Sequence, residues 1–386
     1  MTMGAMEIEE RIAREDDLTE EEMVLNMGPQ HPSTHGVLRL VLKTKGEVIS
    51  EAVPHIGYLH RALEKIGERV NYHQYMPYTD RLDYVAAMNC NLAYALTVEK
   101  LLGVEVPPRA NYIRIIMAEL NRIASHLIFF ATYSLDLGSF TPFLYAFRER
   151  EKILDLFEMA SGVRLTYNYI KIGGVWKDLP PGFVEKAYEF LDYFLPRIDE
   201  YDRILSYNQI FIQRTAGVGV LPASLAIGYG VTGPNLRGSG VNFDLRKDEP
   251  YCGYEKFDFE IPVGKGEMGK TGDAWDRYMV RLQEMRQSCQ LVKQALDELP
   301  EGPVMGRVAR VLRPKAGEVY FRAENPRGEL GFFIISDGSP KPFRLKIRTG
   351  SFTALAAFPE MVRGWMVADV VAILGSLDVI LPEIDR

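Results

Sequence analysis

Two histidines in one short loop are the residues of this sequence best suited to chemistry. Five of the six histidines fall between residues 31 and 73, and two share the loop Gln30-His31-Pro32-Ser33-Thr34-His35-Gly36. Imidazole takes up or releases a proton near neutral pH. Because proline cannot donate to a sheet ladder and glycine relaxes the backbone, we expect both imidazoles to project from a turn between strands. The pattern indicates either a proton-transfer site or a polar hairpin loop with incidental histidines.

Other chemical uses of the sequence are less well supported. A metal site built from His31, His35, His55 and His60 would match no zinc spacing, and a loop that contains proline does not place two histidines on one helical face. The string Gly217-Val218-Gly219-Val220-Leu221-Pro222 begins like a dinucleotide-binding loop. Proline takes the place of its third glycine, and no strand–turn–helix pattern surrounds it. We therefore expect no metal and no nucleotide.

Proton delivery would also need groups from other segments. Asp80-Arg81-Leu82-Asp83-Tyr84 opens one helical stretch, and Leu135-Asp136-Leu137-Gly138 closes another. A histidine, a tyrosine and an aspartate around one cavity would form a general-acid set, in which the carboxylate holds the imidazolium. The alternative for Asp83 and Arg81 is stabilisation of a helix start, and for Asp136 a polar end to a helix. Spacing leaves these alternatives open.

Composition excludes several classes of protein. The 386 residues, 47% hydrophobic and 25% charged, are typical of a soluble globular chain with a large core. The formal net charge of −7 argues against a nucleic-acid partner. Cys90, Cys252 and Cys289 form no CxxC pair, which predicts free thiols in a reducing compartment. We expect no iron–sulfur cluster and no structural zinc bound by this chain alone.

Apolar runs do not predict a membrane span. Residues 7–22 are rich in Glu, Asp and Arg, which argues against a signal peptide. The most apolar runs, 113–130 and 366–381, each contain charged side chains, among them Glu119 and Asp369. Charges are costly at the bilayer centre, so we expect any membrane association to occur through partners.

Periodicity predicts the elements that must position the candidate residues. Alternating strand patterns occupy 24–27, 37–43 and 48–53, and again 317–323, 330–336 and 342–348. Helical patterns occupy 84–102, 109–132, 142–160, 182–206, 273–298 and 353–374. The 109–132 helix has one broad apolar face, formed by Ile113, Ile116, Met117, Leu120, Ile123, Leu127 and Ile128.

These elements predict an α+β fold that is mainly α. A helical bundle core carries small antiparallel sheets at the N- and C-terminal ends. We expect four regions, which are a charged arm (1–22), an N-terminal sheet with the histidine loop (23–57), a helical core with an irregular section at 229–272 (58–305) and a C-terminal α+β region (306–386).

Long strings of this sequence resemble the D subunit of proton-pumping NADH:quinone oxidoreductase, respiratory complex I. They include Gly28-Pro29-Gln30-His31-Pro32-Ser33-Thr34-His35-Gly36-Val37-Leu38-Arg39 and Pro54-His55-Ile56-Gly57-Tyr58-Leu59-His60-Arg61. Supporting strings are Asp80-Arg81-Leu82-Asp83-Tyr84, Leu135-Asp136-Leu137-Gly138, Gly238-Ser239-Gly240, Glu284-Met285-Arg286-Gln287-Ser288, Asp337-Gly338-Ser339 and Ile384-Asp385-Arg386. The resemblance runs from about residue 24 to the end.

The resemblance implies a fold like that of the large subunit of nickel–iron hydrogenases, with the metal site replaced by a quinone pocket. Hydrogenase large subunits hold nickel and iron with two CxxC pairs, one near each end. This chain has no cysteine in the corresponding stretches, 55–61 and 377–386. A hydrogenase with this sequence would lack its metal ligands.

The resemblance also implies roles for individual residues. It places His35 and Tyr84 at the quinone headgroup, with Asp136 as the partner of that histidine. His31 and Thr132 fall at quinone-contact positions, although Thr132 is equally well explained as a helix-surface hydroxyl. Arg61 corresponds to an arginine near the terminal iron–sulfur cluster of a neighbouring subunit. No cofactor is expected on this chain alone.

Partners and location follow from the same resemblance. It implies a cluster-bearing B-type subunit, a C-type subunit, a ferredoxin-like I-type subunit and a membrane H-type subunit, with no nucleic acid. The expected location is peripheral, on the cytoplasmic side of a bacterial cell membrane. One departure is Leu165-Thr166, where many relatives carry Met-His. A second reading is an interaction scaffold that reduces no quinone.

Overall fold

The N-terminal sheet carries the histidine loop at one of its turns. The structure is a computed structural model that describes residues 22–34 and 36–386, so the predicted arm lies, apart from Glu22, outside the described residues. Strands β1 (Glu22–Met27), β2 (Arg39–Lys45) and β3 (Val48–His55) pair antiparallel in that order. Between β1 and β2, the loop makes a single 3₁₀ turn, η2 (Pro32–Thr34). The three predicted strands are thereby confirmed.

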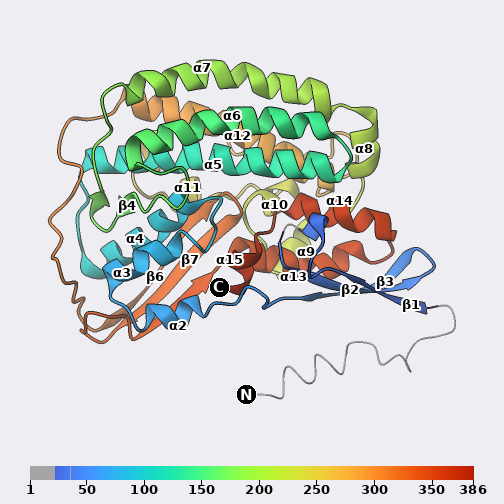
Figure 1. The fold of residues 1–386 in the computed structure, drawn as a ribbon, viewed down its shortest axis with the longest axis horizontal. Coiled ribbons are helices and arrows are strands. Elements are labelled where there is room, and N and C mark those ends of the chain that lie inside the picture. The colour runs from blue at the N-terminus through green and yellow to red at the C-terminus, as the bar shows by residue number, and fades with distance from the viewer. Residues whose placement is uncertain (1–21, 35) are drawn as a thin grey trace.

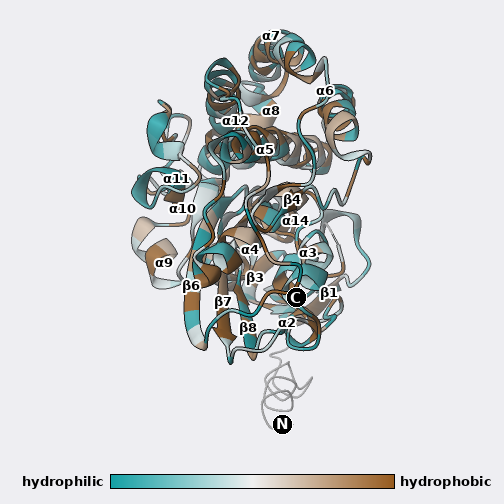
Figure 2. Cartoon of the chain, turned by 90° about the vertical axis from the view of Figure 1, so that its left-hand side faces the viewer, coloured by the Kyte–Doolittle hydropathy of each residue, from teal (hydrophilic) through white to brown (hydrophobic). Residues whose placement is uncertain are grey.

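A long buried helix, α5 (Pro108–Asp136), forms the centre of the helical core. It packs against α6 (Phe140–Ser161) and α12 (Ala274–Asp297), and α7 (Phe183–Tyr201) covers α6 and α12 from outside (Figures 1 and 2). Proline at its first position needs no hydrogen-bond partner for its nitrogen, which favours the start there. In the described chain, α5 is the one helix long and apolar enough to cross a membrane, yet 89% of its most apolar window is buried in the protein.

A second layer contains the C-terminal sheet and the helices that cover it. Helix α4 (Ala87–Leu102) packs on β6 (Gly317–Asn325) and β7 (Gly328–Ser336), and β8 (Arg344–Arg348) completes the antiparallel order β6-β7-β8. Smaller elements of this layer are α2 (Leu63–Gly67), α3 (Tyr72–Thr79), β4 (Ile170–Lys171) and β5 (Gly174–Val175). This layer lies below α5 to α7 in both ribbon views (Figures 1 and 2).

The predicted helix at 353–374 is wrong, because the structure divides this segment into α13 (Gly350–Val362) and α14 (Val367–Leu377). Arg363 is extended (ψ 130°) and Gly364 has a φ of +82°, so the helix cannot continue. Both helices pack with the N-terminal sheet in a second hydrophobic core that includes Leu40, Ile49 and Phe358. The two ends of the chain therefore share one core.

Short helices interrupt the segments predicted as irregular or as one long helix. The predicted 182–206 helix is α7 followed by a π-helical turn, η3 (Asp202–Ser206). The remaining short elements are α8 (Gln209–Thr215), α9 (Ala223–Gly228), α10 (Gly233–Gly238), α11 (Leu245–Asp248), η4 (Tyr254–Lys256) and α15 (Leu381–Asp385). The mainly α, α+β fold class is confirmed, and the division into four regions stays a prediction.

Candidate functional site

The histidine loop is held by backbone and hydroxyl contacts of its own. His31 is exposed, and its Nδ1 accepts from the Ser33 backbone N–H at 3.2 Å. Buried Thr34 places its hydroxyl 2.8 Å from His31 O and 2.9 Å from Gly36 O. The loop packs against α14 (Figure 1). His35 lies outside the described residues, so its predicted role stays a prediction.

Tyr84 lies on the turn between α3 and α4 with 40% of its surface exposed. Partial burial raises the pKa of its phenol, Arg327 opposes that rise, and Asp83 adds to it. The hydroxyl therefore stays protonated at neutral pH and can act as a hydrogen-bond donor. This is the state that a proton-donating tyrosine requires.

A buried ion cluster supports the turn that carries Tyr84. Asp83 Oδ2 accepts from Arg327 Nη1 at 2.9 Å, and Arg327 Nη2 donates to Asp378 Oδ1 at 3.2 Å. Arg327 Nη1 also donates to Ser125 Oγ at 2.9 Å. Asp83 Oδ1 accepts from the Val85 N–H at 3.2 Å, so the helix-start role is present as well. The cluster joins the Tyr84 turn to the residue that follows α14.

One further carboxyl group of the C-terminal segment, that of Glu383, is buried near this cluster. Glu383 accepts a hydrogen bond from the Ser351 hydroxyl, and burial with the neighbouring Asp83 raises the Glu383 pKa to about 8. Sequence patterns did not single out Arg327, Asp378 or Glu383. No local signal could have found Arg327, because the polar string 324–329 at the tip of an apolar hairpin has the composition of an ordinary surface turn.

The end of α5, which carries Thr132 and Asp136, packs against α14. Thr132 Oγ1 donates to Ile128 O at 2.9 Å, as expected for a helix-surface hydroxyl. Asp136 is half-buried, and a Cβ on Gly375 of α14 would lie 3.6 Å from its Oδ2. Tyr133 donates to Ala372 O at 3.1 Å and fixes this packing. The structure therefore gathers the histidine loop, Asp136 and, through Arg327, the Tyr84 turn around α14.

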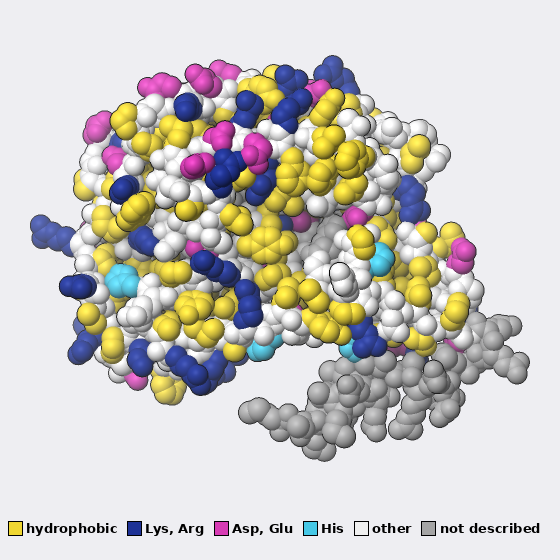
Figure 3. Space-filling view, in the orientation of Figure 1, with side chains coloured by type: hydrophobic (Ala, Val, Ile, Leu, Met, Phe, Trp, Pro, Cys, Tyr) yellow, Lys and Arg dark blue, Asp and Glu magenta, His cyan; other side chains and the backbone are white. Residues whose placement is uncertain are grey.

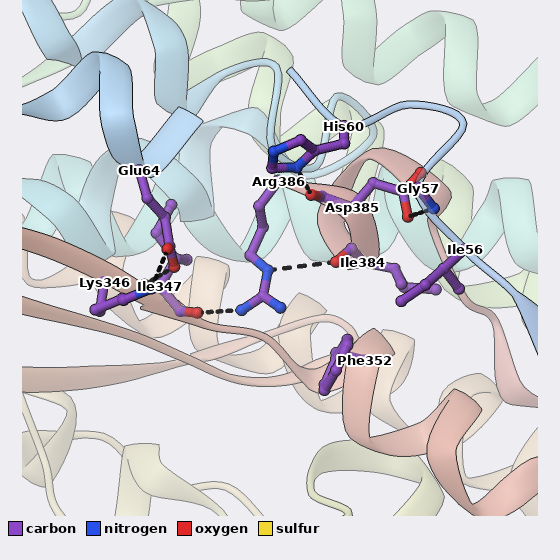
Figure 4. A pocket seen from close by; sticks show the side chains of 10 residues that line it. All are labelled: Ile56, Gly57, His60, Glu64, Lys346, Ile347, Phe352, Ile384, Asp385 and Arg386. Carbon is purple, nitrogen blue, oxygen red and sulfur yellow. Dashed lines mark hydrogen bonds and ion pairs between the residues drawn. The ribbon is translucent and has the colours of Figure 1, made fainter. Parts of the chain in front are cut away.

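The C-terminus closes onto the loop that follows β3. Asp385 Oδ1 and Oδ2 accept from the Gly57 and Leu59 N–H groups at 2.8 and 2.7 Å. His60 Nδ1 lies 2.7 Å from Asp385 O, and Figure 4 shows the contacts of Asp385 with Gly57 and His60. A cavity of about 390 Å³ opens beside this contact, lined also by Phe352. The stretches 55–61 and 377–386 thus meet here, and the described residues contain no group of three or more side chains that could hold a metal ion.

Arg61 lies apart from α14, against the end of α3. Its Nη2 donates to Arg81 O at 2.8 Å. Both arginines line a cavity of about 410 Å³, together with Leu63, Ile66, Gln74, Pro77 and Tyr78. Neither this cavity nor the one beside the C-terminus includes Tyr84 or Asp136 in its lining.

Exposed hydrophobic side chains surround the end of α5. Leu135, Phe140 and Leu144 are 41%, 58% and 51% exposed, where α5 ends and α6 begins. The face drawn in Figure 3 shows hydrophobic side chains gathered over this part of the molecule. An exposed apolar patch of this kind is typical of a surface that meets a partner or an apolar ligand.

Comparison with known proteins identifies the family. The family model described as the 49 Kd subunit of respiratory-chain NADH dehydrogenase matches residues 136–316 and 307–386. The chain is 54% identical over 379 residues to a D subunit of the NADH-quinone oxidoreductase of Anaeromyxobacter sp. (strain K), and the match covers 98% of this chain and 100% of the relative. It is 53% identical over 382 residues to the D subunit of the NADH-quinone oxidoreductase of Prosthecochloris aestuarii, and the match covers 98% of this chain and 96% of the relative.

A third relative extends the match to another genus. The D subunit of the NADH-quinone oxidoreductase of Geotalea uraniireducens is 51% identical over 389 residues, covering 94% of this chain and 98% of the relative. The resemblance seen in the sequence is confirmed, and the chain acts as part of an oxidoreductase complex. It belongs to the family of the 49 Kd subunit of respiratory-chain NADH dehydrogenase.

Proposed function

We propose that this chain forms the quinone-reduction site of a complex I-type NADH:quinone oxidoreductase. Its relatives are named as D subunits of NADH-quinone oxidoreductase, which makes quinone the expected substrate. The observation that carries the proposal is Tyr84, a partly exposed phenol on a turn anchored by the buried Asp83–Arg327 pair. An anchored donor with an accessible hydroxyl fits binding of a quinone carbonyl.

Quinone takes two electrons and two protons to become quinol. In this proposal Tyr84 and His35 each donate one proton, and Asp136 holds the imidazole of His35 in position. His31 and Thr132 contact the quinone. An iron–sulfur cluster of the B-type neighbour supplies the electrons, and Arg61 lies towards that neighbour.

The remaining partners and the location complete the proposal. The C-type, ferredoxin-like I-type and membrane H-type subunits complete the assembly, with this chain peripheral on the cytoplasmic side of a bacterial membrane. The exposed Leu135, Phe140 and Leu144 support a contact with such a partner or with the apolar tail of the quinone. After donation, negative charge remains on groups in a region of low dielectric, and its cost can drive loop movement that couples the reaction to proton translocation.

The test is Tyr84→Phe in the assembled enzyme, which removes one hydroxyl and leaves the ring. Quinone reductase activity is expected to fall by roughly 10²–10⁴-fold, as for a lost general acid. Electron transfer from NADH to an artificial acceptor upstream of the quinone site should stay unchanged, which separates a damaged site from failed assembly. The matched control is Tyr229→Phe, because Tyr229 is also exposed (39%) and lies outside the candidate site.

The second candidate is an interaction scaffold that reduces no quinone. Full quinone reductase activity of Tyr84→Phe, across pH and quinone concentration, would show that the donor assignment is wrong and would favour the scaffold. The partly exposed phenol of Tyr84 on its anchored turn favours the first candidate, because it leaves a hydrogen-bond donor for a quinone carbonyl.

A further inference from the structure

Arg281 is a buried arginine of α12 that is linked through ion pairs to the turn that carries Tyr84. Its exposed fraction is 1%, and its Nε lies 3.7 Å from Asp378 Oδ2. Asp378 Oδ1 accepts from Arg327 Nη2 at 3.2 Å, and Arg327 Nη1 donates to Asp83 Oδ2 at 2.9 Å. Asp83 directly precedes Tyr84. The carboxylate of Asp378 is therefore shared by two arginines, one of which holds the Tyr84 turn.

The same guanidinium also contacts the end of α5, on the Asp136 side of the proposed site. It lies over the ring of Phe129, 4.5 Å from the ring centroid, where a cation is attracted to the π face. Phe129 stacks on Tyr133, with the two ring centroids 5.3 Å apart, and Tyr133 precedes Asp136 by three residues on α5. Arg281 thus joins the anchor of Tyr84 to the helix end that carries Asp136.

Fixed acceptors hold the Arg281 side chain in place. Both terminal nitrogens donate to acceptors on α10, α12 and the end of α14. These acceptors are Arg277 O at 2.9 Å and Ser376 O at 3.1 Å from Nη1, and Asn235 Oδ1 at 3.0 Å and Leu377 O at 3.1 Å from Nη2. Nε–H has no hydrogen-bond partner among the described residues and is the donor left for Asp378. Because the guanidinium is planar and rigid, these bonds fix where its charge meets Asp378.

The positive charge of Arg281 is matched by Asp378 and by the end of α14. The last carbonyl groups of a helix carry partial negative charge, and Ser376 O and Leu377 O belong to the last turn of α14. Burial lowers the pKa of Arg281 to about 10, and the charge of Asp378 opposes that fall. The guanidinium therefore stays protonated at neutral pH.

We propose that Arg281 is a positioning residue of the quinone site, which sets where the Tyr84 hydroxyl lies relative to the end of α5. A displacement of Arg281 acts on Asp378 and Arg327 on one side and on Phe129 on the other. Placement matters because a reacting group misplaced by about 1 Å can cost roughly 10²-fold in rate. The inference rests on the proposed function, and Arg281 itself contacts no quinone in it.

The first test is Arg281→Lys in the assembled enzyme. Lysine keeps the charge but replaces the rigid fork by one flexible ammonium group, which cannot reproduce the same set of bonds. We expect the kcat of quinone reduction to fall by roughly 10–10²-fold, while electron transfer from NADH to an artificial acceptor upstream stays unchanged. Arg286→Lys is the matched control on the same helix. Arg286 pairs instead with Asp199 and Asp202, at 2.8 and 3.1 Å, so this variant should keep wild-type activity.

A double-mutant cycle with Tyr84→Phe separates positioning from a general structural role. If Arg281 acts by placing the Tyr84 hydroxyl, Arg281→Lys should cost no more than about twofold in the Tyr84→Phe background, because no hydroxyl remains to be misplaced. A purely structural role would lower activity by the same factor in both backgrounds.

Phe129→Leu tests the contact with α5 and keeps the inference testable if Arg281→Lys fails to assemble. Leucine keeps the position apolar but removes the π face from the guanidinium. We expect a smaller loss of quinone reduction, which should again disappear in the Tyr84→Phe background. Hydrogen exchange of the assembled enzyme should be faster at 80–86 in Arg281→Lys and unchanged there in Arg286→Lys.

Two results would overturn the inference. One is full quinone reductase activity of an assembled Arg281→Lys enzyme, and the other is an equal loss in the wild-type and Tyr84→Phe backgrounds. If either occurs while Tyr84→Phe alone still impairs quinone reduction, the inference fails and the proposed function stands. Full activity of Tyr84→Phe alone would instead contradict the proposed function, and the inference would fall with it.

Discussion

Arg327 and Asp83 form a fully buried ion pair, with Arg327 Nη1 2.9 Å from Asp83 Oδ2. Arg327 occupies the tip of the β6–β7 hairpin, and that tip points into the protein. The adjacent Gly328 has a φ of +115°, and a Cβ there would lie 2.6 Å from Thr232 Oγ1. The tip of the hairpin can therefore pack into the protein interior only with glycine at position 328. It delivers a cation to a carboxylate that lies 244 residues earlier in the chain.

Replacing Arg327 by methionine should destabilise the protein strongly. Asp83 and Asp378 would lose their shared cation while remaining buried, at a cost of about 3–5 kcal/mol in the free energy of unfolding. Denaturant unfolding of the full chain measures this cost. Arg363→Met removes an arginine from an exposed pair with Glu360 and should change stability by less than about 1 kcal/mol. Equal stability of the two variants would contradict a structural role for Arg327.

Removing the imidazole of His35 should impair quinone reduction about as much as removing the hydroxyl of Tyr84. His35→Ala deletes the second proton donor, whereas Asp136→Asn only weakens the hold on the imidazole and should have a milder effect. Steady-state quinone reductase assays of the assembled enzyme give the order of the two effects. A larger loss in Asp136→Asn than in His35→Ala would show that the carboxylate itself acts on the quinone.

Glu383→Gln should make protein stability less sensitive to alkaline pH. The Glu383 pKa is raised in the folded state to about 8 from the ordinary value of 4.5. The group therefore stabilises the fold fully below pH 4.5, and this contribution is lost as pH rises through 8. The amide of the variant cannot ionise, so the variant should gain on wild type between about pH 5 and 9 by a few kcal/mol. Parallel stability curves across this range would refute the raised pKa.

Asp385→Ala should loosen the loop that follows β3. The Gly57 and Leu59 N–H groups would lose the carboxylate that accepts from both, at a cost of about 0.5–1.5 kcal/mol for each hydrogen bond, because water can reach these donors. Hydrogen exchange followed by mass spectrometry should show faster exchange in peptides that cover 56–62. Peptides from the centre of α5 provide the internal reference. Unchanged exchange at 56–62 would mean that the C-terminus does not hold this loop.

Local patterns predicted most of the elements because each depends on residues close in sequence. The period of apolar residues in 109–132 reflects the one face that a helix buries, and the structure extends that helix to Pro108–Asp136. The strands at both ends follow from alternation in the same way. The helix break at Arg363 and Gly364 was not predicted, because the apolar pattern continues across these residues. The break is visible only in their backbone angles.

The same distinction between local patterns and tertiary contacts applies to the candidate site residues. Tyr84, Asp136 and the histidine loop were identified from residue type and from resemblance. Both indicate what chemistry a side chain can perform, but neither gives its position in space. The approach of the histidine loop and of Asp136 to α14 depends on packing of the N-terminal region and of α5 against the C-terminal region, which no local pattern records.

Sequence alone determined the family, the fold class and the residue types available for proton transfer. These properties depend on short sequence motifs and on the local periodicity of apolar residues. The tertiary structure decided which charges meet. Arg327 reaches Asp83 and Asp378 inside the protein, where burial excludes the water that would otherwise solvate each charge. The energy of a buried charge depends on every neighbour that the fold brings to it, and those neighbours come from distant parts of the chain.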